Sequence, residues 1–407
     1  MGFLDKAILN SRRAIQIDKN ILPAKMNIAN IELQQGNIVQ AIKLLEGIVS
    51  EKDSYQEAKA NLALAYRRVG KIDKSLKVYE KIVFDGPWSL KAKFNYGTTL
   101  ITNEGFEQGW RYYENRWKIP PQNSLTWPLE DKSIWKGERG KRVVVWKEQG
   151  IGDDIIFLSL VPEVKEMCDT LSVFIDPRLQ SLCKRTMPDI HFIADEKALN
   201  SEDCDFHLPL GSVPGLIRND ISDFDRTVRG YLKADPVRVE AIRKELKLEG
   251  KTVIGVSWKS FKVLNVLKKS VQLKDMERIF SGLDVVLVNL QYGDVEDEIR
   301  EFKEATGIDV VQCASVDNRE DLDGLAALIE VCDLVVSTSN VTVHLAGALA
   351  KETWVLLPHA ANFWWLLVRK DSIWYPSLSL YRQPTLDDWD SVYTEIRKDL
   401  EMRFLCD

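Results

Sequence analysis

Hydrophobic residues recur with two different periodicities along the chain. Up to about residue 118, apolar side chains recur with the spacing of amphipathic helices. From residue 141 onward, short apolar runs rich in Val, Ile and Leu alternate with amphipathic stretches. Alternation of this kind predicts buried parallel strands that are connected by helices. The sequence therefore predicts an all-α region followed by α/β lobes with doubly wound sheets.

The amino-terminal region repeats with a period of about 34 residues. Small residues stand at one fixed point of the repeat, at Ala7, Ala41 and Ser75, and turn glycines at Gly36 and Gly70. A small residue lets the two helices of a hairpin pack closely, and a glycine ends the first helix. A third, less regular copy follows, and we expect the chain to begin inside the second helix of an incomplete copy. This region resembles tetratricopeptide (TPR) proteins.

Short apolar runs mark the predicted strands of two sheets. The first set comprises residues 142–147, 171–175, 191–194 and 205–210. The second set comprises residues 252–258, 284–291, 309–313, 333–338 and 353–358. A charged stretch at 235–251 separates the two sets and predicts a helix with a hinge. Two such lobes form a cleft, and open α/β sheets bind ligands at the carboxyl ends of their strands.

These patterns divide the chain into four parts. TPR-like helical repeats occupy residues 1–118. Residues 119–140 are rich in proline and tryptophan, and we interpret them as an ordered linker. An amino-terminal Rossmann-like lobe spans 141–247, and a carboxy-terminal Rossmann-like lobe with a terminal helix spans 248–407.

Composition and charge exclude several classes of function. The formal charge of −6 offers no electrostatic footprint for nucleic acid. No apolar run is long enough to span a membrane, and the first residues lack the features of a signal peptide. The six cysteines are scattered without a C-x-x-C pair, so we expect no metal site. Reduced thiols in a cytoplasmic protein are the expectation that follows.

The first motif that could bind a ligand or take part in catalysis follows the strand predicted at 142–147. It reads EQGIGDDI, and its glycines, Gly150 and Gly152, allow a tight turn and a close approach to a ligand. Asp153 would project into the cleft, where a carboxylate can act as general base on a hydroxyl. The alternative is that Asp153 or Asp154 only caps the following helix.

The second motif is the hydroxyl-rich turn that follows the strand predicted at 333–338. Free N–H groups and hydroxyls at a helix start suit a diphosphate, and a histidine one turn later could reach a phosphate or ribose. The alternative is a capped helix with a partly buried histidine. The candidate ligand-binding residues of this turn are Ser339, Asn340, Val341, Thr342 and His344.

Two further stretches are candidates for the cleft. Trp258, Lys259 and Ser260 follow the first strand of the second lobe, where a lysine could neutralise a diphosphate leaving group. The alternative is that Lys259 and the nearby Lys268 and Lys269 are simply solvated. Residues 358–383 are rich in aromatic side chains, which could wall a base or sugar pocket or pack between the lobes.

Five stretches, in this order, resemble bacterial TPR-linked glycosyltransferases related to the lipopolysaccharide heptosyltransferases. They are GWRYYENRW, EQGIGDDIIF, VIGVSWKS, VHLAGALAKETWVLLP and WYPSLSLYRQPTLDDW, and the resemblance runs from about residue 105 almost to the end. It implies a GT-B fold, in which 141–247 form the acceptor lobe and 248–407 the donor lobe. It also implies a nucleotide-sugar as donor substrate, no cofactor, no metal requirement and inversion at the anomeric carbon.

The resemblance also implies roles for single residues. Asp153 matches the position of the catalytic base, and Lys259 lies near the lysine that follows this strand in the family. His344 and the helix start at Leu345–Ala348 match the segment that binds the donor phosphates. The chain departs from the family at Ser339 and Asn340, where relatives usually carry aspartate and threonine. This difference bears on which donor the chain binds and on whether it transfers a sugar.

Three functions are compatible with the sequence. The first is transfer of a sugar to a glycan or protein acceptor, in which Asp153 deprotonates the attacking hydroxyl. The second is protein O-glycosylation, resembling the TPR-bearing O-GlcNAc transferases, with a peptide in the TPR groove. The third is a non-catalytic scaffold with a degenerate transferase lobe. In each case the TPR surface could also bind a protein partner or a second copy of the chain.

Overall fold

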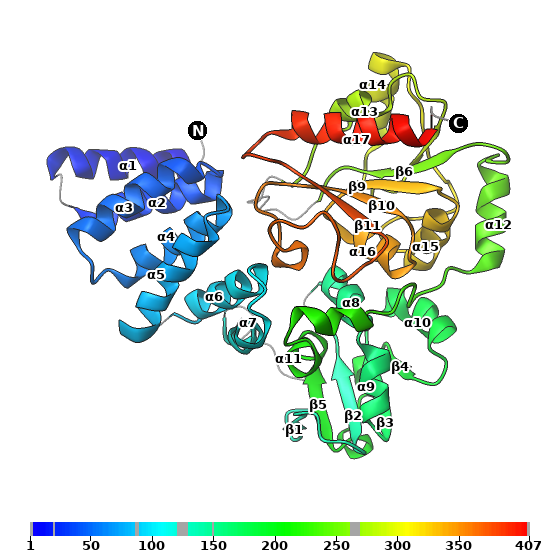
Figure 1. Ribbon diagram of the computed structural model, residues 1–407, viewed down its shortest axis with the longest axis horizontal. Coiled ribbons are helices and arrows are strands. Elements are labelled where there is room, and N and C mark those ends of the chain that lie inside the picture. Colours follow the sequence, from blue (N-terminus) through cyan, green and yellow to red (C-terminus); the bar gives the residue numbers. More distant parts are fainter. Residues whose placement is uncertain are drawn as a thin grey trace.

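The computed structural model describes residues 3–18, 21–85, 89–119, 129–148, 150–260 and 269–404, without the side chains of 3–5, 7, 8, 12, 15 and 83–85. An array of helices comes first and two α/β lobes follow (Figure 1). The array consists of α1 (Phe3–Ile17), α2 (Leu22–Gln35), α3 (Ile38–Glu51), α4 (Gln56–Arg68), α5 (Ile72–Asp85), α6 (Leu90–Thr102) and α7 (Phe106–Tyr113). Helices α2–α3, α4–α5 and α6–α7 form successive hairpins, as TPR repeats do.

Small residues let the two helices of each hairpin meet. Ser75 in α5 is completely buried, and its hydroxyl donates a 2.7 Å hydrogen bond to the carbonyl oxygen of Ala63 in α4. In the third hairpin the helix backbones approach closely, because a Cβ on Gly97 would lie 2.8 Å from the carbonyl oxygen of Gly109. Gly97 occupies the repeat position of Ala63, and Gly109 occupies that of Ser75. The predicted packing role is confirmed for Ser75, Ala41 is also completely buried, and the side chain of Ala7 lies outside the described ones.

The turns between the paired helices repeat as well. Gly36 and Gly70 adopt left-handed backbone conformations, with φ of 81° and 73°, where α2 and α4 end. Glu104 stands at the equivalent position of the next repeat and keeps this conformation with φ of 63°, although it is not glycine. The third hairpin therefore preserves the geometry of the turn at some cost in backbone strain.

The amino-terminal lobe contains a five-stranded, all-parallel sheet. Its strands are β1 (Ser133–Ile134), β2 (Arg142–Trp146), β3 (Thr170–Phe174), β4 (His191–Ile193) and β5 (Phe206–Pro209), in the spatial order β1-β5-β2-β3-β4. Its helices are α8 (Ile151–Leu158), α9 (Val161–Met167), α10 (Gln180–Thr186) and α11 (Pro214–Ile217). Buried Val143, Val145 and Val173 fill the sheet interior, as the valine-rich runs predict.

The carboxy-terminal lobe contains a six-stranded, all-parallel sheet. Its strands are β6 (Val253–Ser257), β7 (Val286–Asn289), β8 (Val310–Val311), β9 (Leu334–Thr338), β10 (Thr353–Leu357) and β11 (Leu378–Arg382), in the order β11-β10-β9-β6-β7-β8. Its helices are α13 (Glu277–Phe280), α14 (Glu296–Thr306), α15 (Leu322–Glu330), α16 (Val341–Ala348) and α17 (Trp389–Phe404). Helix α12 (Pro236–Glu245), which the sequence analysis includes in the first lobe, packs against α15 of this lobe. Two facing parallel lobes constitute the GT-B architecture that the sequence predicts.

Two strands lie where the sequence predicts none. β1 falls inside the stretch 119–140, and it pairs with β5, so this part of the interpreted linker belongs to the sheet. Trp135 follows it and is almost completely buried, whereas Trp127 lies outside the described residues. β11 lies within the aromatic-rich stretch and extends the second sheet beyond β10.

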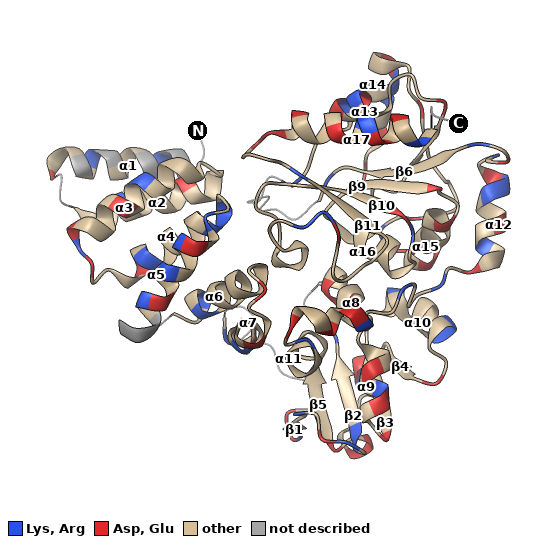
Figure 2. Cartoon of the chain, viewed as in Figure 1, with Lys and Arg blue, Asp and Glu red and all other residues tan. Residues whose placement is uncertain are grey.

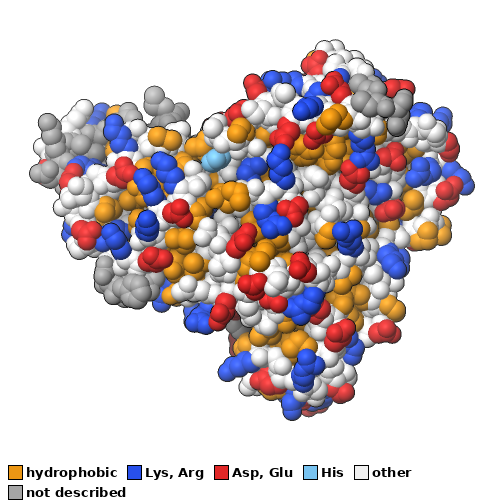
Figure 3. All heavy atoms as spheres, in the orientation of Figure 1, with side chains coloured by type: hydrophobic (Ala, Val, Ile, Leu, Met, Phe, Trp, Pro, Cys, Tyr) orange, Lys and Arg blue, Asp and Glu red, His pale blue; other side chains and the backbone are white. Residues whose placement is uncertain are grey.

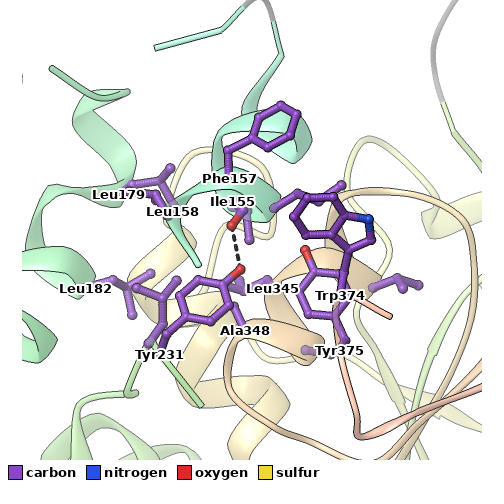
Figure 4. Packing of buried hydrophobic residues seen from close by; sticks show 14 of the residues in the cluster. Ile155, Phe157, Leu158, Leu179, Leu182, Tyr231, Leu345, Ala348, Trp374 and Tyr375 are labelled. Carbon is purple, nitrogen blue, oxygen red and sulfur yellow. Dashed lines mark hydrogen bonds between the residues drawn. The ribbon is translucent and has the colours of Figure 1, made fainter. Parts of the chain in front are cut away.

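Most aromatic side chains of the stretch 358–383 are packed in the core rather than exposed on a pocket wall. Trp374 contacts Phe157 and Phe224 edge to face, with ring centroids 5.9 and 5.0 Å apart. Figure 4 shows this packing around α8, where the hydroxyl of Tyr231 donates to the carbonyl oxygen of Ile155. The packing alternative for these aromatics is therefore the one that the structure favours.

The third hairpin belongs to the same hydrophobic core as the two lobes. The indole of Trp110 in α7 donates a 2.7 Å hydrogen bond to the carbonyl oxygen of Arg218. Tyr113 contacts Phe363 and Trp364 of the second lobe, at centroid distances of 5.6 and 6.5 Å. Contacts of this kind with both lobes fix the end of the array to the α/β part.

Charged side chains are few on the strands and many on the outer helices (Figure 2). Lysine and arginine are interspersed with aspartate and glutamate over the face seen in Figure 3. In the described ranges, no helix has the length and apolar character that crossing a membrane requires. Five described cysteines are free thiols, and Cys406 lies outside the described residues.

Candidate functional site

A cleft of about 430 Å³ lies between the two lobes. All the loops around it follow carboxyl ends of strands, which is where open α/β sheets bind ligands. Ile151 and Arg178 contribute from the amino-terminal lobe. The carboxy-terminal lobe contributes Tyr292, Gly293, Asp294, Asn318, Arg319, Leu322 and Val341.

Two guanidinium groups make the cleft suitable for an anion. Arg178 is held by Asp176 through two parallel bonds of 2.9 Å, and its Nη1 donates to the carbonyl oxygen of Arg319 across the cleft at 3.1 Å. Arg319 is largely exposed. Asp294 adds a carboxylate to this lining. Planar guanidinium groups can bind phosphates bidentately, but a diphosphate would have to compete with Asp176 for Arg178 and with Glu320, 3.3 Å from Nε of Arg319.

Asn318 offers an unused acceptor beside the two arginines. Its Nδ2 donates to the carbonyl oxygens of Asn289 and Gln291, at 3.0 and 3.2 Å. Within the described part of the chain, its buried Oδ1 accepts no hydrogen bond. A buried acceptor without a donor is costly, and a hydroxyl or amino group of a ligand would satisfy it.

The loop before α8 is held in place from several sides. The buried carboxyl of Asp154 accepts a 2.6 Å hydrogen bond from the backbone N–H of Glu148. Glu148 in turn accepts 2.8 Å and 2.7 Å bonds from the backbone of Gly211 and from Nη2 of Arg116. Burial raises the pKa of Asp154 well above its ordinary value. Asp154 is therefore a structural residue of the loop; Gln149 lies outside the described residues.

Asp153 is not among the residues that line the cleft. It is partly exposed in the first turn of the helix, and its backbone N–H donates to the carbonyl oxygen of Gly150. Burial raises the pKa of Tyr113 and of Tyr375, and the nearby Asp153 carboxylate raises both further. The charge of Asp153 therefore acts on Tyr113 of the array and on Tyr375 of the second lobe, whereas Ile151 of the same helix lines the cleft.

Gly152 and His344 bring the two lobes together. A Cβ on Gly152 would lie 3.1 Å from Cδ2 of His344 in α16. The imidazole stacks on Trp365 with a centroid distance of 5.4 Å, and its Nδ1 lies 3.3 Å from the hydroxyl of Tyr375. Burial, helped by Lys269, lowers the pKa of His344 to about 3. The imidazole is therefore neutral, so it can contribute a hydrogen bond but no positive charge.

The polar turn before α16 is occupied by bonds within the protein. Asn340 caps the helix, because its Oδ1 accepts from the backbone N–H of Thr342 at 3.0 Å. Its Nδ2 donates to the hydroxyl of Ser257 at 2.7 Å. Ser339 accepts a 2.9 Å bond from the indole of Trp365. Ser339, Asn340 and Thr342 are buried, and Val341 is the residue of this turn that lines the cleft.

The loop after β6 is organised by a single glutamate. Trp258 is completely buried, and its indole donates a 2.8 Å bond to Glu298 in α14. Lys259 forms an ion pair with the same carboxylate. The backbone N–H of Ser260 donates to the hydroxyl of Ser270, and Lys268 lies outside the described residues. A diphosphate would have to compete with Glu298 for Lys259.

The structure therefore brings the two predicted motifs together, through Gly152 and His344, but adds residues that the sequence analysis missed. Arg178, Tyr292, Asn318 and Arg319 line the cleft without belonging to any motif. The available signal was their position, because each lies in the loop that follows a strand of one of the two sheets.

A second hollow runs along the helical array. This helical groove has a volume of about 710 Å³ and is formed by α2, α4, α5 and α6. Amide side chains and small apolar residues form most of its lining, with Glu57, Arg68 and Lys91 as charged members. The groove's other members are Asn30, Leu33, Gln34, Gln56, Ala60, Asn61, Leu64, Ile82, Ser89, Ala92 and Asn95.

Comparisons with known proteins found relatives that are less than 30% identical in sequence to the chain. No protein-family model matches it. Protein FlbA of Caulobacter vibrioides is 29% identical over 361 residues, which cover 83% of this chain and 60% of that protein. The chain thus spans about 60% of the length of this curated relative.

Three solved structures are similar to the chain. Escherichia coli ADP-heptose lipopolysaccharide heptosyltransferase II covers 65% of this chain and 98% of its own, with 12% identity and a TM-score of 0.48. The family 9 glycosyltransferase of Veillonella parvula covers 67% and 99%, with 11% identity and a TM-score of 0.45. A mutant O-GlcNAc transferase of Thermobaculum terrenum covers 98% and 88%, with 12% identity and a TM-score of 0.36.

Proposed function

We propose that this chain is a cytoplasmic glycosyltransferase that moves a sugar from a nucleotide-sugar donor to an acceptor hydroxyl, with inversion and without a metal ion. The observation that carries the proposal is the inter-lobe cleft at the carboxyl ends of two parallel sheets. Arg178 and Arg319 line it, and a diphosphate that displaces their partners Asp176 and Glu320 would meet positive charge there. The start of α16 adds backbone N–H groups through Val341.

The proposed reaction is a direct displacement. The acceptor hydroxyl attacks the anomeric carbon while Asp153 takes its proton, and the bond from that carbon to the diphosphate oxygen breaks. The electron pair leaves with the nucleoside diphosphate, whose charge is stabilised by Arg178 and Arg319. Lys259 contributes only if it exchanges Glu298 for the leaving group. Neutral His344 contributes a hydrogen bond rather than charge.

We propose a polypeptide as the acceptor. The charge of Asp153 acts on Tyr113 of the array, and Asp153 is not part of the cleft lining, which is compatible with an acceptor that approaches from the helical array. The helical groove is also large enough to hold an extended segment of chain. This version of the proposal corresponds to protein O-glycosylation.

A non-catalytic scaffold remains the second candidate, for one specific reason. The polar side chains expected to meet the donor, Ser339, Asn340 and Lys259, are all engaged within the protein. A scaffold would retain these internal bonds without ever binding a donor.

A thermal-shift panel of UDP-, GDP-, ADP-, CMP- and dTDP-sugars, with the bare nucleotides, separates the two candidates. A ligand at a hundred times its dissociation constant stabilises the folded state by about 2.7 kcal/mol. A shift with one nucleotide class, lost in Arg178→Gln and Arg319→Gln, supports a donor site in the cleft. No shift with any member at millimolar concentration would reject the transferase and favour the scaffold.

A further inference from the structure

Two consecutive arginines lie where the helical array meets the carboxy-terminal lobe. Arg67 and Arg68 end α4, and both are partly buried. Arg68 belongs to the lining of the helical groove and also of a small hollow next to it. The rest of this hollow is formed by Arg67, Ile72, Thr102, Ala360, Ala361, Leu366 and Leu367. The arginine pair therefore stands at the end of the groove that faces the second lobe.

Neither arginine has an acidic partner within the described part of the chain. Arg67 donates to the hydroxyl of Thr98, and Nη1 of Arg68 donates to the carbonyl oxygen of Leu33 at 3.0 Å. Each guanidinium has five N–H donors, so most of them are left for another ligand. Burial lowers the pKa of both groups, that of Arg68 to about 10 with Arg67 contributing. Two cations are thus held side by side, partly out of water, and their hydrogen-bond acceptors among the described residues are neutral.

The pair is not a requirement of the repeat. The equivalent residues of the preceding repeat are Leu33 and Gln34, and those of the following repeat are Ile101 and Thr102. The other two hairpins therefore form the same packing without charge at this point. A feature that costs desolvation and is confined to one hairpin calls for a compensating anion.

We propose that Arg67 and Arg68 form a subsite for a carboxylate side chain of a polypeptide that lies in the helical groove. The inference rests on the polypeptide acceptor proposed above. It commits to a polypeptide because Arg68 lines the groove of about 710 Å³, whereas the adjoining hollow of about 10 Å³ has no room for a ligand of its own, so the carboxylate would reach the arginines from a chain that lies in the groove. It commits to an acidic side chain because, in the described lining of this path, the cations Arg67, Arg68 and Lys91 outnumber the acid Glu57.

The position of the subsite relative to the cleft gives it a role. The loop that closes the hollow at Leu366 continues from Trp365, whose ring stacks on His344. A carboxylate bound by the arginines would therefore anchor the acceptor beside the wall of the second lobe. The subsite selects acceptors that carry Asp or Glu at a set distance from the modified residue.

Fluorescence anisotropy of a labelled oligoglutamate peptide with the full chain tests the subsite. We expect binding that weakens with salt, about tenfold or more weaker binding in Arg67→Gln and in Arg68→Gln, and little change in Arg13→Gln, an exposed arginine of α1. Arg68→Lys, which keeps the charge, should retain most of the binding. Circular dichroism melts of all variants show whether the hairpins remain folded.

Three results would overturn the inference. The first is no binding of oligoglutamate, and the second is equal binding to the wild type and to a folded Arg67→Gln, Arg68→Gln double variant. The third is full competition by inorganic phosphate at a concentration similar to that of the peptide, which would indicate a site for free anions. The nucleotide thermal shift of the wild type is measured in parallel. A normal shift without oligoglutamate binding identifies failure of the subsite alone, and oligoglutamate binding without a shift identifies failure of the donor site alone.

Discussion

A Cβ on Gly152 would stand 3.1 Å from the imidazole of His344, so the two lobes meet at a point that only glycine fits without adjustment. We expect Gly152→Val to destabilise the protein by about 1–3 kcal/mol, because the extra atoms must displace a buried ring. His344→Ala should relieve this cost, so that the two changes couple by about 0.5 kcal/mol or more, as residues in contact do. Urea denaturation of the wild type, both single variants and the double variant measures the coupling. Additive effects would show that the two residues do not touch.

Asp153→Asn should abolish most of the transfer activity while leaving the fold intact. Loss of a general base typically costs about 100- to 10,000-fold in rate. The neighbouring change Asp154→Asn is the matched control, because that buried carboxyl acts as an acceptor for the backbone of Glu148, a role that asparagine can keep. Release of nucleotide from the donor identified by the thermal-shift panel provides the readout. Full activity in Asp153→Asn would remove Asp153 from the mechanism.

Stability should fall in acid because of His344. Burial lowers the pKa of this imidazole to about 3, whereas it is about 6.5 in the unfolded chain. The unfolded state therefore binds the proton first, and the stability that is present above pH 6.5 is lost as the pH falls toward 3. The expected loss is about 2 kcal/mol between pH 6.5 and pH 5. Denaturation at each pH should show a smaller loss for His344→Gln, and equal slopes would contradict the buried neutral histidine.

Breaking the ion pair between Arg116 and Glu148 should be among the most damaging single changes. Both side chains are buried, at 6% and 3% exposure, and the pair joins the end of the array to the loop before α8. Removing one partner of a buried pair typically costs about 3–5 kcal/mol. We expect this for Arg116→Met, measured by chemical denaturation. Arg142→Met removes an exposed pair with Asp205 and should cost at most about 1 kcal/mol; a similar cost for both would be inconsistent with this difference in burial.

Two helical glycines of the array should respond in opposite directions to alanine. A Cβ on Gly97 would clash with the backbone of α7, so Gly97→Ala should cost about 1–3 kcal/mol. Gly47 is exposed in α3, with nothing within 4 Å of a Cβ. Gly47→Ala should therefore stabilise the protein by up to about 1 kcal/mol through helix propensity. Melting temperatures of the two variants provide the comparison, and stabilisation by Gly97→Ala would show that the third hairpin is looser than described.

Local patterns were sufficient to predict most of the fold. The valine-rich runs predicted the long central strands such as β2 and β9, and the repeat period predicted the hairpins, because both depend on residues close in sequence. β11 was missed because Tyr381 and Arg382 give it an irregular pattern. The packing of the third hairpin against the lobes depends on pairs such as Trp110 and Arg218, which lie 108 residues apart. Local sequence patterns therefore cannot predict it.

The candidate site was predicted only in part, for a related reason. Glycine-rich and hydroxyl-rich turns identified Gly152 and His344, since turns after strands are recognisable from composition. Arg178 and Asn318 stand in ordinary loops, and only the folded sheets place them opposite each other. Conversely, the burial of Trp258 and the pairing of Lys259 depend on Glu298, a residue far along the chain from both.

The hairpin α6–α7 is shared by the array and the lobes, and this has a geometric consequence. Trp110 and Tyr113 of this hairpin belong to the core of the lobes, and α6 of the same hairpin lines the groove, so a segment held in the groove would stand at a fixed distance from a sugar held in the cleft. The molecule would then work as a ruler: the residue that receives the sugar is set by its spacing from the anchored segment, whatever its immediate neighbours. Acceptors would share a spacing rather than a sequence motif around the modified hydroxyl.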